Sequence, residues 1–119
     1  MKNDLKIHYS QVGQLMPYAQ NSRTHSDKQI NQVVRSIKKF GFISPVIIDD
    51  KNTIVAGHAR VLAAKILSLD DVPTIRVEHL SEAEKRAYIL ADNKIAENGP
   101  DLFMSFQNGN LVLQVVFKP

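Results

Sequence analysis

Residues 54–69 read IVAGHARVLAAKILSL, and this stretch decides the fold. Its first three residues are apolar and predict a short strand, which Gly57 ends. An apolar helical stripe with one basic residue, Lys65, then follows. A strand that continues through a glycine into a helix brings the first helical turn to the edge of a sheet. The unpaired N–H groups of such a turn carry partial positive charge and attract anions.

Arg60 lies in this first turn, where its forked guanidinium suits a phosphate or a carboxylate. Gly57 lets a ligand approach the backbone closely because it carries no Cβ atom. The junction therefore predicts a phosphate site. The same arrangement also occurs in α/β proteins that bind nothing there, so a purely structural interpretation stands beside the functional one.

The composition limits the classes of protein to consider. A chain of 119 residues predicts one domain, and the lack of cysteine excludes disulfides, thiolate metal sites and cysteine nucleophiles. The first ten residues lack the apolar segment of a signal peptide, and no run of about 18 apolar residues occurs. We therefore expect a cytoplasmic protein without a membrane segment.

The net charge of +3 is concentrated in the first half, where residues 1–50 carry seven Lys or Arg against four Asp. Ser26 and Gln29 form a capping box that opens a helix ending at Gly41, with apolar residues at helical spacing from Ile30 to Phe40. The opposite face is basic and can contact nucleic acid or simply be solvated. Its residues are Lys28, Arg35, Lys38 and Lys39.

Four short strands are expected around these helices. Residues 5–10 alternate and predict an edge strand, residues 46–48 and 53–56 predict a hairpin, and residues 72–78 predict a further strand. The polar segment 18–24 predicts an exposed loop whose Arg23 can reach an anion.

Ser81 and Glu84 form a second capping box. The helix that they open is expected to turn Ala83, Ala87, Leu90, Ala91 and Ile95 inward. Near its end, Asp92, Asn93 and Lys94 bring together an acid, an amide and an amine, which suits either a metal–nucleotide contact or a solvated helix end. We expect a domain over residues 1–97. Residues 98–119 form a hydrophobic tail, in which Asn108-Gly109 predicts a hairpin and a surface for self-association.

Four segments in fixed order carry a resemblance to a known family: NSR with SIKKFGF (residues 21–42), GFISPVIID (41–49), IVAGHARVLAAKILSLDDVP (54–73) and SEAEKRAYILADNKIAE (81–97). Together they resemble the ParB/sulfiredoxin superfamily, especially the stand-alone ParB-like domains of phages and mobile elements, over residues 5–97. The resemblance implies an α+β fold with a small mixed sheet packed by helices.

The resemblance also implies a ligand. In the ParB branch a GERR motif at this junction binds nucleotide phosphates, which are those of CTP in the chromosome-partitioning members. Residues 57–64 match that motif in part, residues 41–45 match a segment that lies against the nucleotide, and Asp92-Asn93 resembles a pair that helps to hold Mg²⁺ and phosphates. The candidate nucleotide-binding residues are Arg23, Gly41, Ser44, Pro45, Gly57, His58, Ala59, Arg60, Asn93 and Lys94, with Asp92 and Asn93 as metal ligands.

Two departures shape the expected activity. His58 stands where sulfiredoxin has its catalytic cysteine, which excludes sulfur chemistry. His58 and Ala59 also replace a Glu and an Arg of the ParB motif, which removes one charge of each sign from the phosphate site. Binding through Gly57, Arg60 and the helix N-terminus is compatible with both changes.

Three functions follow from these residues. The first is a nucleotide-binding module, with CTP and Mg²⁺ the foremost ligands, in a plasmid, phage or DNA-modification system; its DNA binding would be weak and salt-dependent. The second is a nuclease, a phosphotransferase or a weak nucleotide hydrolase in which His58 acts as acid or base. The third is an interaction domain without a ligand.

Overall fold

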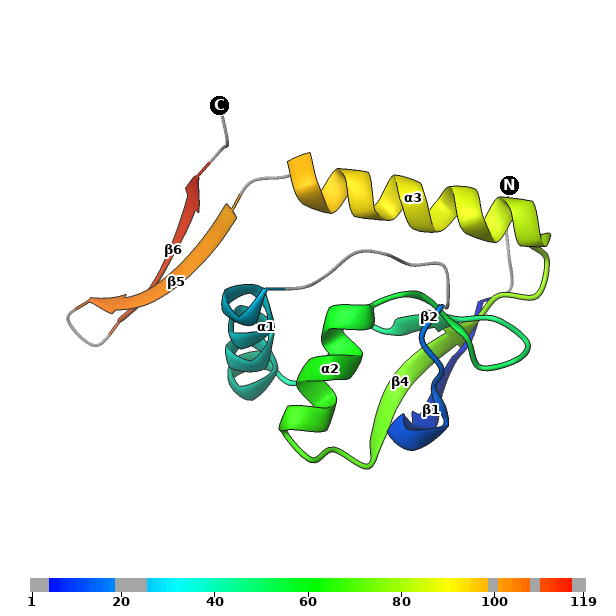
Figure 1. The fold of residues 1–119 in the computed structure, drawn as a ribbon. Coiled ribbons are helices and arrows are strands. Elements are labelled where there is room, and N and C mark those ends of the chain that lie inside the picture. The colour runs from blue at the N-terminus through cyan, green and yellow to red at the C-terminus, as the bar shows by residue number, and fades with distance from the viewer. Residues whose placement is uncertain (1–4, 19–25, 99–100, 108–109, 117–119) are drawn as a thin grey trace.

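A mixed four-stranded sheet forms the centre of the computed structural model, which describes residues 5–18, 26–98, 101–107 and 110–116, with side chains up to Asp92. Its strands lie in the order β1-β4-β2-β3; β2 is parallel to β4, and the other neighbours are antiparallel. The elements (Figure 1) are β1 (Ile7–Gln11), a short 3-10 helix η1 (Val12–Gln14), α1 (Asp27–Phe40), β2 (Val46–Ile48), β3 (Ile54–Ala56), α2 (His58–Ile66), β4 (Asp71–Arg76), α3 (Glu82–Asn98), β5 (Asp101–Gln107) and β6 (Asn110–Val116).

The predicted α+β class with a small mixed sheet and packed helices is confirmed. β1 is an edge strand and β2–β3 is an antiparallel hairpin, as the alternation patterns indicated. The predicted strand at 72–78 begins one residue earlier and ends at Arg76. Local hydrogen-bonding residues set the strand and helix ends, which is why the pattern located them closely.

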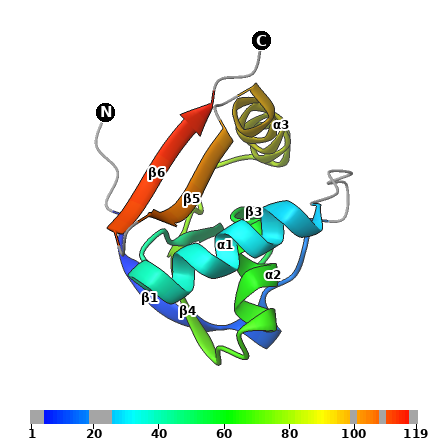
Figure 2. The same cartoon turned by 90° about the vertical axis from the view of Figure 1, so that its left-hand side faces the viewer.

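The core joins the sheet to α2 and to the segment around η1. α1 and α2 pack side by side (Figure 2), and the buried face of α2 includes Val61 and Ala64, which belong to one cluster with the strand residues. Burying this face removes apolar side chains from water, at about 25 cal/mol for each Å². The buried residues that form the cluster are Val12, Leu15, Val46, Ile48, Ile54, Val61, Ala64 and Val72.

The predicted N-cap of α1 and the complete predicted capping box of α3 are present. The Ser26 Oγ accepts a 3.1 Å hydrogen bond from the Gln29 amide, and α1 ends at Gly41 with a φ of 85°. At the start of α3, Ser81 and Glu84 each accept a hydrogen bond from the other's backbone N–H, at 3.1 and 3.0 Å. These reciprocal bonds satisfy N–H groups that the first turn of a helix leaves unpaired.

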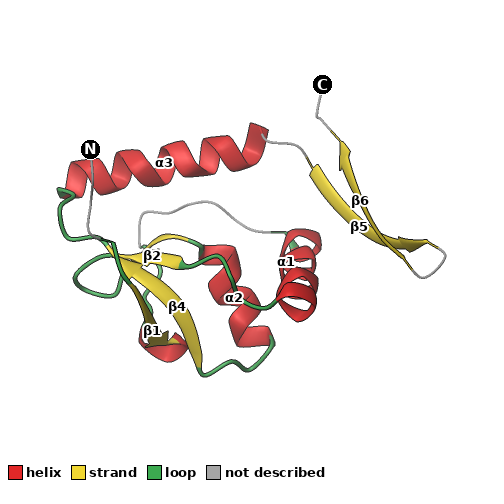
Figure 3. Cartoon of the chain, turned by 180° about the vertical axis from the view of Figure 1, so that it is seen from behind, coloured by secondary structure: helices red, strands yellow, loops and turns green. Residues whose placement is uncertain are grey.

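The predicted inward face of α3 is wrong. Ala83, Ala87, Leu90 and Ala91 are exposed, and Leu90 is 65% exposed. Over the described residues, the side chains that α3 buries are Lys85 and Ile89. The helix contacts β3 and runs along one side of the domain (Figures 1 and 3). The apolar spacing predicted the wrong face because Lys85 is buried in an ion pair with Asp49, which is described below. The side chain of Ile95 lies outside the described residues.

The last two strands form a sheet of their own. β5 and β6 pair antiparallel from Asp101↔Val116 to Gln107↔Asn110, and neither pairs with the four-stranded sheet (Figure 1). The two strands that flank Asn108-Gly109 therefore pair antiparallel, and the turn predicted to join them lies outside the described residues. The division of the chain into a domain and a tail at residue 97 stays a prediction, as does self-association. Over the described residues, no helix has the length and apolar character needed to cross a membrane.

Candidate functional site

The predicted strand–glycine–helix junction is formed by β3, Gly57 and α2. β3 ends at Ala56, Gly57 adopts a left-handed conformation with φ 105° and ψ 24°, and α2 begins at His58. The Val61 amide donates to the Gly57 carbonyl at 3.0 Å, which closes the first turn. A side chain at residue 57 would be strained in this conformation, so the chain needs glycine to turn from the strand into the helix.

Arg60 folds back over the junction. A Cβ atom placed on Gly57 would lie only 2.8 Å from Arg60 Nη2, so the guanidinium occupies the space above this glycine. Arg60 Nη2 donates a 2.8 Å hydrogen bond to the Pro45 carbonyl, and this bond joins the segment before β2 to the start of α2. The Nε of Arg60 is buried and has no hydrogen-bond partner among the described residues. A buried donor without an acceptor is rare and costly, and it points to a group that a ligand can satisfy.

The charge of Arg60 is influenced from α3. Burial lowers the pKa of the Arg60 guanidinium, while Asp92 and Tyr88 act in the opposite direction. The guanidinium stays a cation because the pKa of arginine starts far above neutrality. Arg60 is therefore a poorly hydrated positive charge at the junction, and its charge is favoured by Asp92 of α3.

His58 has a hydrogen-bonding role in this geometry. Its Nε2 accepts a 3.4 Å hydrogen bond from the Tyr18 amide, which ties the segment after η1 to the first residue of α2. A nitrogen that accepts from a backbone amide is not available as a proton acceptor for a substrate while that bond persists.

The other predicted site residues divide into three groups. Pro45 accepts a hydrogen bond from Arg60, Asp92 acts electrostatically on the pKa of Arg60, and Ala59 follows His58 in the first turn of α2. Gly41 and Ser44 are exposed on the segment that leads to Pro45. Arg23 lies outside the described residues, as do the side chains of Asn93 and Lys94 in α3. The binding roles assigned to all of these residues stay predictions.

The predicted nucleic-acid residues lie together on α1. Lys28, Arg35, Lys38 and Lys39 are all exposed. Figure 2 shows the side of the domain on which α1 lies in front, next to α2. Lys38 and Lys39 also lie in the last turn of α1, where cations interact favourably with the helix dipole. The face is thus accessible to a polyanion.

A buried ion pair was missed by the sequence analysis. Lys85 Nζ lies 3.0 Å from Asp49 Oδ2, and the two side chains are 8% and 5% exposed. Lys85 Nζ also contacts Glu82 Oε1 at 2.6 Å, one helical turn earlier. The only local signal was an Asp that follows a buried strand and precedes a turn, a position where its side chain accepts backbone hydrogen bonds.

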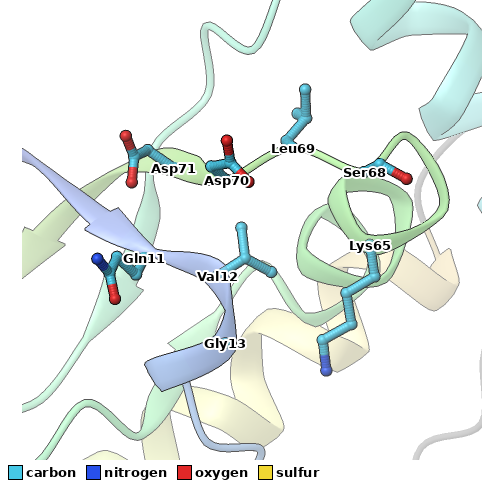
Figure 4. A pocket seen from close by; sticks show the side chains of 8 residues that line it. All are labelled: Gln11, Val12, Gly13, Lys65, Ser68, Leu69, Asp70 and Asp71. Atoms are coloured by element: carbon cyan, nitrogen blue, oxygen red, sulfur yellow. The ribbon is translucent and has the colours of Figure 1, made fainter.

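A separate hollow of about 620 Å³ lies at the other end of α2, beside η1 and the segment that leads from α2 into β4 (Figure 4). It is lined by Gln11, Val12, Gly13, Lys65, Ser68, Leu69, Asp70 and Asp71. In Figure 4 the Lys65 side chain extends away from the two carboxylates. In the part of the chain that the structure describes, no three His, Asp or Glu side chains gather as metal ligands. This hollow therefore lacks the convergent polar groups that a ligand site requires.

Comparison with known proteins decides the family. A model of the ParB N-terminal domain matches residues 2–94. The chain belongs to this family. The ParB-like nuclease domain-containing protein YnaK of Escherichia coli strain K12 is 49% identical to it over 86 residues, which cover 72% of this chain and 99% of the relative. The stage 0 sporulation protein J of Bacillus subtilis strain 168 is 35% identical over 86 residues, which cover 69% of this chain and 30% of the relative.

Solved structures agree on the ParB fold. The C-terminally truncated chromosome-partitioning protein ParB from Caulobacter crescentus, complexed with CTP-gamma-S, has a TM-score of 0.65 at 23% identity. That alignment covers 74% of this chain and 52% of the other. The same protein complexed to the centromeric parS site has a TM-score of 0.62 at 19% identity, over 72% of this chain and 46% of the other. This ParB N-terminal domain thus spans about half the length of those chains.

Proposed function

We propose that this ParB N-terminal domain binds a nucleoside triphosphate, CTP first among them, together with Mg²⁺, as the nucleotide-responsive module of a DNA-associated partition or regulation system. The observation that carries the proposal is Arg60, whose buried Nε lacks an acceptor within the described chain, at the first turn of α2. A phosphate oxygen would supply that acceptor, and the N–H groups of the turn would add to it. The CTP-gamma-S complex of the Caulobacter protein, which shares the fold, supports the choice of ligand.

Asp92 gives a reason to include the metal ion. Its carboxylate interacts with Arg60, so a phosphate bound to Arg60 would lie near a second negative charge. A divalent cation between the carboxylate and the phosphate oxygens would remove that repulsion. Mg²⁺ is commonly held by one or two carboxylates together with substrate phosphates, so a full set of protein ligands is not needed.

Two observations support a proposal of DNA association, the basic face of α1 and the membership of the ParB N-terminal domain family. Relatives of this chain include a nucleoid occlusion protein of Bacillus cereus, 32% identical over 71 residues. Contacts from exposed lysines go to the phosphate backbone and carry no sequence information. We therefore propose weak binding that depends steeply on salt and on Lys38 and Lys39.

Calorimetric titration with CTP, ATP, GTP and dCTP in the presence of Mg²⁺ tests the nucleotide proposal. We expect saturable binding of one nucleotide, and a loss of roughly tenfold or more in Arg60→Ala, because hydrogen bonds to charged groups contribute about 1.5–3 kcal/mol. Arg35→Ala removes an exposed arginine from α1 and is the matched control. Absence of binding by folded wild-type protein, or equal loss in both variants, would refute the proposal.

A metal-dependent nuclease or phosphotransferase is the second candidate, favoured by the name of the YnaK relative. The hydrogen bond from the Tyr18 amide to His58 Nε2 argues against this histidine as the base. Incubation of supercoiled DNA with the protein and Mg²⁺ tests the candidate. Cleavage by wild type that is lost in His58→Ala would support it over the binding module. A folded protein that neither binds nucleotide nor cleaves DNA would leave an interaction domain.

A further inference from the structure

The buried ion pair connects α3 to the turn between β2 and β3. Asp49 uses its two carboxylate oxygens differently: Oδ1 accepts hydrogen bonds from the Lys51 and Thr53 amides at 2.8 and 2.9 Å, and Oδ2 receives Lys85 Nζ at 3.0 Å. The Asp49 amide in turn donates to the Thr53 carbonyl at 3.0 Å. One carboxylate therefore closes the turn and holds a helix against it.

Both partners stay charged over the neutral range. Burial alone would raise the pKa of the Asp49 carboxyl, but hydrogen bonds from the Thr53 amide, Lys85 and the Lys51 amide hold it below its usual value. Hydrogen bonds to Glu82 and Asp49 raise the pKa of Lys85 above its usual value. A buried pair with these bonds is directional, since the ammonium must meet the carboxylate at a fixed distance and angle.

The face of α3 that contains Lys85 packs beside β3, the strand that leads through Gly57 into the turn of Arg60. Lys85, Tyr88, Ile89 and Asp92 follow the i, i+3, i+4, i+7 spacing of one helical face. Ile89 is 4% exposed, and Tyr88 and Asp92 both act on the pKa of Arg60. At about 1.5 Å per residue, Lys85 and Asp92 are about 10 Å apart along the axis. Fixing Lys85 therefore fixes the position of Asp92 relative to Arg60.

We propose that Lys85, held by Asp49, is a positioning residue for the nucleotide site. The ion pair sets the distance of α3 from the junction, and thereby places Asp92 and Tyr88 beside the guanidinium of Arg60. Lys85 itself would not touch the nucleotide. The expected effect of Lys85 on nucleotide affinity rests on the proposed nucleotide function. The effect of Lys85 on the position of α3 does not need a ligand.

The test compares the full chain with Lys85→Met and Lys85→Arg, and with Lys65→Met as the matched control on an exposed lysine of α2. The ligand-free measurement is the Nε–Hε signal of Arg60 in a ¹⁵N-edited NMR spectrum. We expect Lys85→Met to move this signal, Lys85→Arg to restore it, and Lys65→Met to leave it unchanged. An Arg60 signal at the wild-type position in folded Lys85→Met would overturn the proposal, whether or not the protein binds nucleotide.

The second measurement is the affinity for CTP with Mg²⁺. We expect Lys85→Met to weaken it about tenfold, within the range of coupling between groups of one network, and Lys85→Arg to recover most of the loss. Unchanged affinity in Lys85→Met would overturn the positioning role. If wild type binds no CTP, the proposed function fails, and the Arg60 signal alone decides whether the ion pair positions α3.

A variant that leaves Asp49 buried without its partner risks unfolding. The double variant Asp49→Asn with Lys85→Met avoids this, because the amide oxygen still accepts from the turn and neither side chain is charged. We expect it to fold and to show the displaced Arg60 signal and the weakened CTP binding. A folded double variant with the wild-type signal and affinity would refute the proposal.

Discussion

Replacement of Gly57 by alanine tests the geometry of the junction. The residue has a φ of 105°, which side chains rarely adopt. The new Cβ atom would lie 2.8 Å from Arg60 Nη2 and 3.2 Å from Cζ. Two separate costs follow, one in the backbone of residue 57 and one in the displacement of the guanidinium from the Pro45 carbonyl.

The size of the effect follows from these two costs. A left-handed conformation at a residue with a side chain costs about 1–2 kcal/mol. Loss of the hydrogen bond from Arg60 to Pro45, which has a charged donor, costs about 1.5–3 kcal/mol. Their sum is an upper value, because the end of a flexible side chain can shift. We therefore expect Gly57→Ala to lower the free energy of unfolding by about 2–4 kcal/mol, a large part of the stability of a small domain.

Urea denaturation followed by circular dichroism measures this change, and two other glycines serve as controls. A Cβ atom added at Gly13 would meet no atom within 4 Å, and this glycine has no left-handed φ, so Gly13→Ala should change the free energy of unfolding by about 0.5 kcal/mol or less. Gly41 has a φ of 85° and a ψ of 173°, a backbone region that essentially only glycine adopts, and open space around it, so Gly41→Ala should be destabilising through backbone strain alone. Gly57→Ala and Gly41→Ala should therefore both destabilise the protein more than Gly13→Ala.

A double-mutant cycle with Arg60→Ala isolates the second cost. With the guanidinium removed, Gly57→Ala should cost only the backbone strain, so the two changes together should destabilise by less than their sum. Strict additivity, or a Gly57→Ala as mild as Gly13→Ala, would show that Arg60 does not lie over Gly57 in solution.

Two further predictions concern the charges. The pKa of Asp49 is held below the ordinary aspartate value of 3.8, so its contribution is present above that pH and is lost as the pH falls through the folded-state value. The difference in unfolding free energy between wild type and Asp49→Asn should thus shrink below about pH 4 in urea titrations at stepped pH; a difference that grows in acid would contradict the pairing with Lys85. For DNA, Lys38→Gln with Lys39→Gln should reduce the slope of log affinity against log salt by about 2 relative to Lys65→Gln, as measured by fluorescence anisotropy. An unchanged slope would show that DNA does not contact this end of α1.

Local signals account for what the sequence predicted correctly. Ser26 and Gln29 lie three residues apart, and Gly57 interrupts an apolar run, so each feature is decided within one turn of chain. Membership of the ParB N-terminal domain family, expected from the order of four motifs, is confirmed over residues 2–94. Helix caps and a strand–glycine–helix junction can be predicted from the sequence because the residues that form them lie at fixed spacings along the chain.

The missed features all join residues that are far apart in the sequence. Lys85 lies 36 residues from Asp49, and Tyr18 lies 40 residues from His58. A lysine within a helix that also contains alanine and leucine is ordinarily placed on the solvated face, so the helical pattern assigned the wrong side of α3 to the core. Only the tertiary partner makes the burial of Lys85 favourable.

Arg60 is the residue at which stability and proposed function oppose one another. Its Nη2 stabilises the junction through the Pro45 carbonyl, whereas its Nε is a buried donor that no described residue pairs, which costs about 1–3 kcal/mol. Arg60→Ala removes both the stabilising hydrogen bond to Pro45 and the destabilising unpaired Nε. The two effects therefore partly cancel in the unfolding free energy of the free protein. A bound phosphate would accept a hydrogen bond from Nε, so that only the stabilising effects of Arg60 would remain. The loss caused by Arg60→Ala should therefore be larger in nucleotide affinity than in unfolding free energy, and affinity is the quantity that separates a ligand-binding arginine from a structural one.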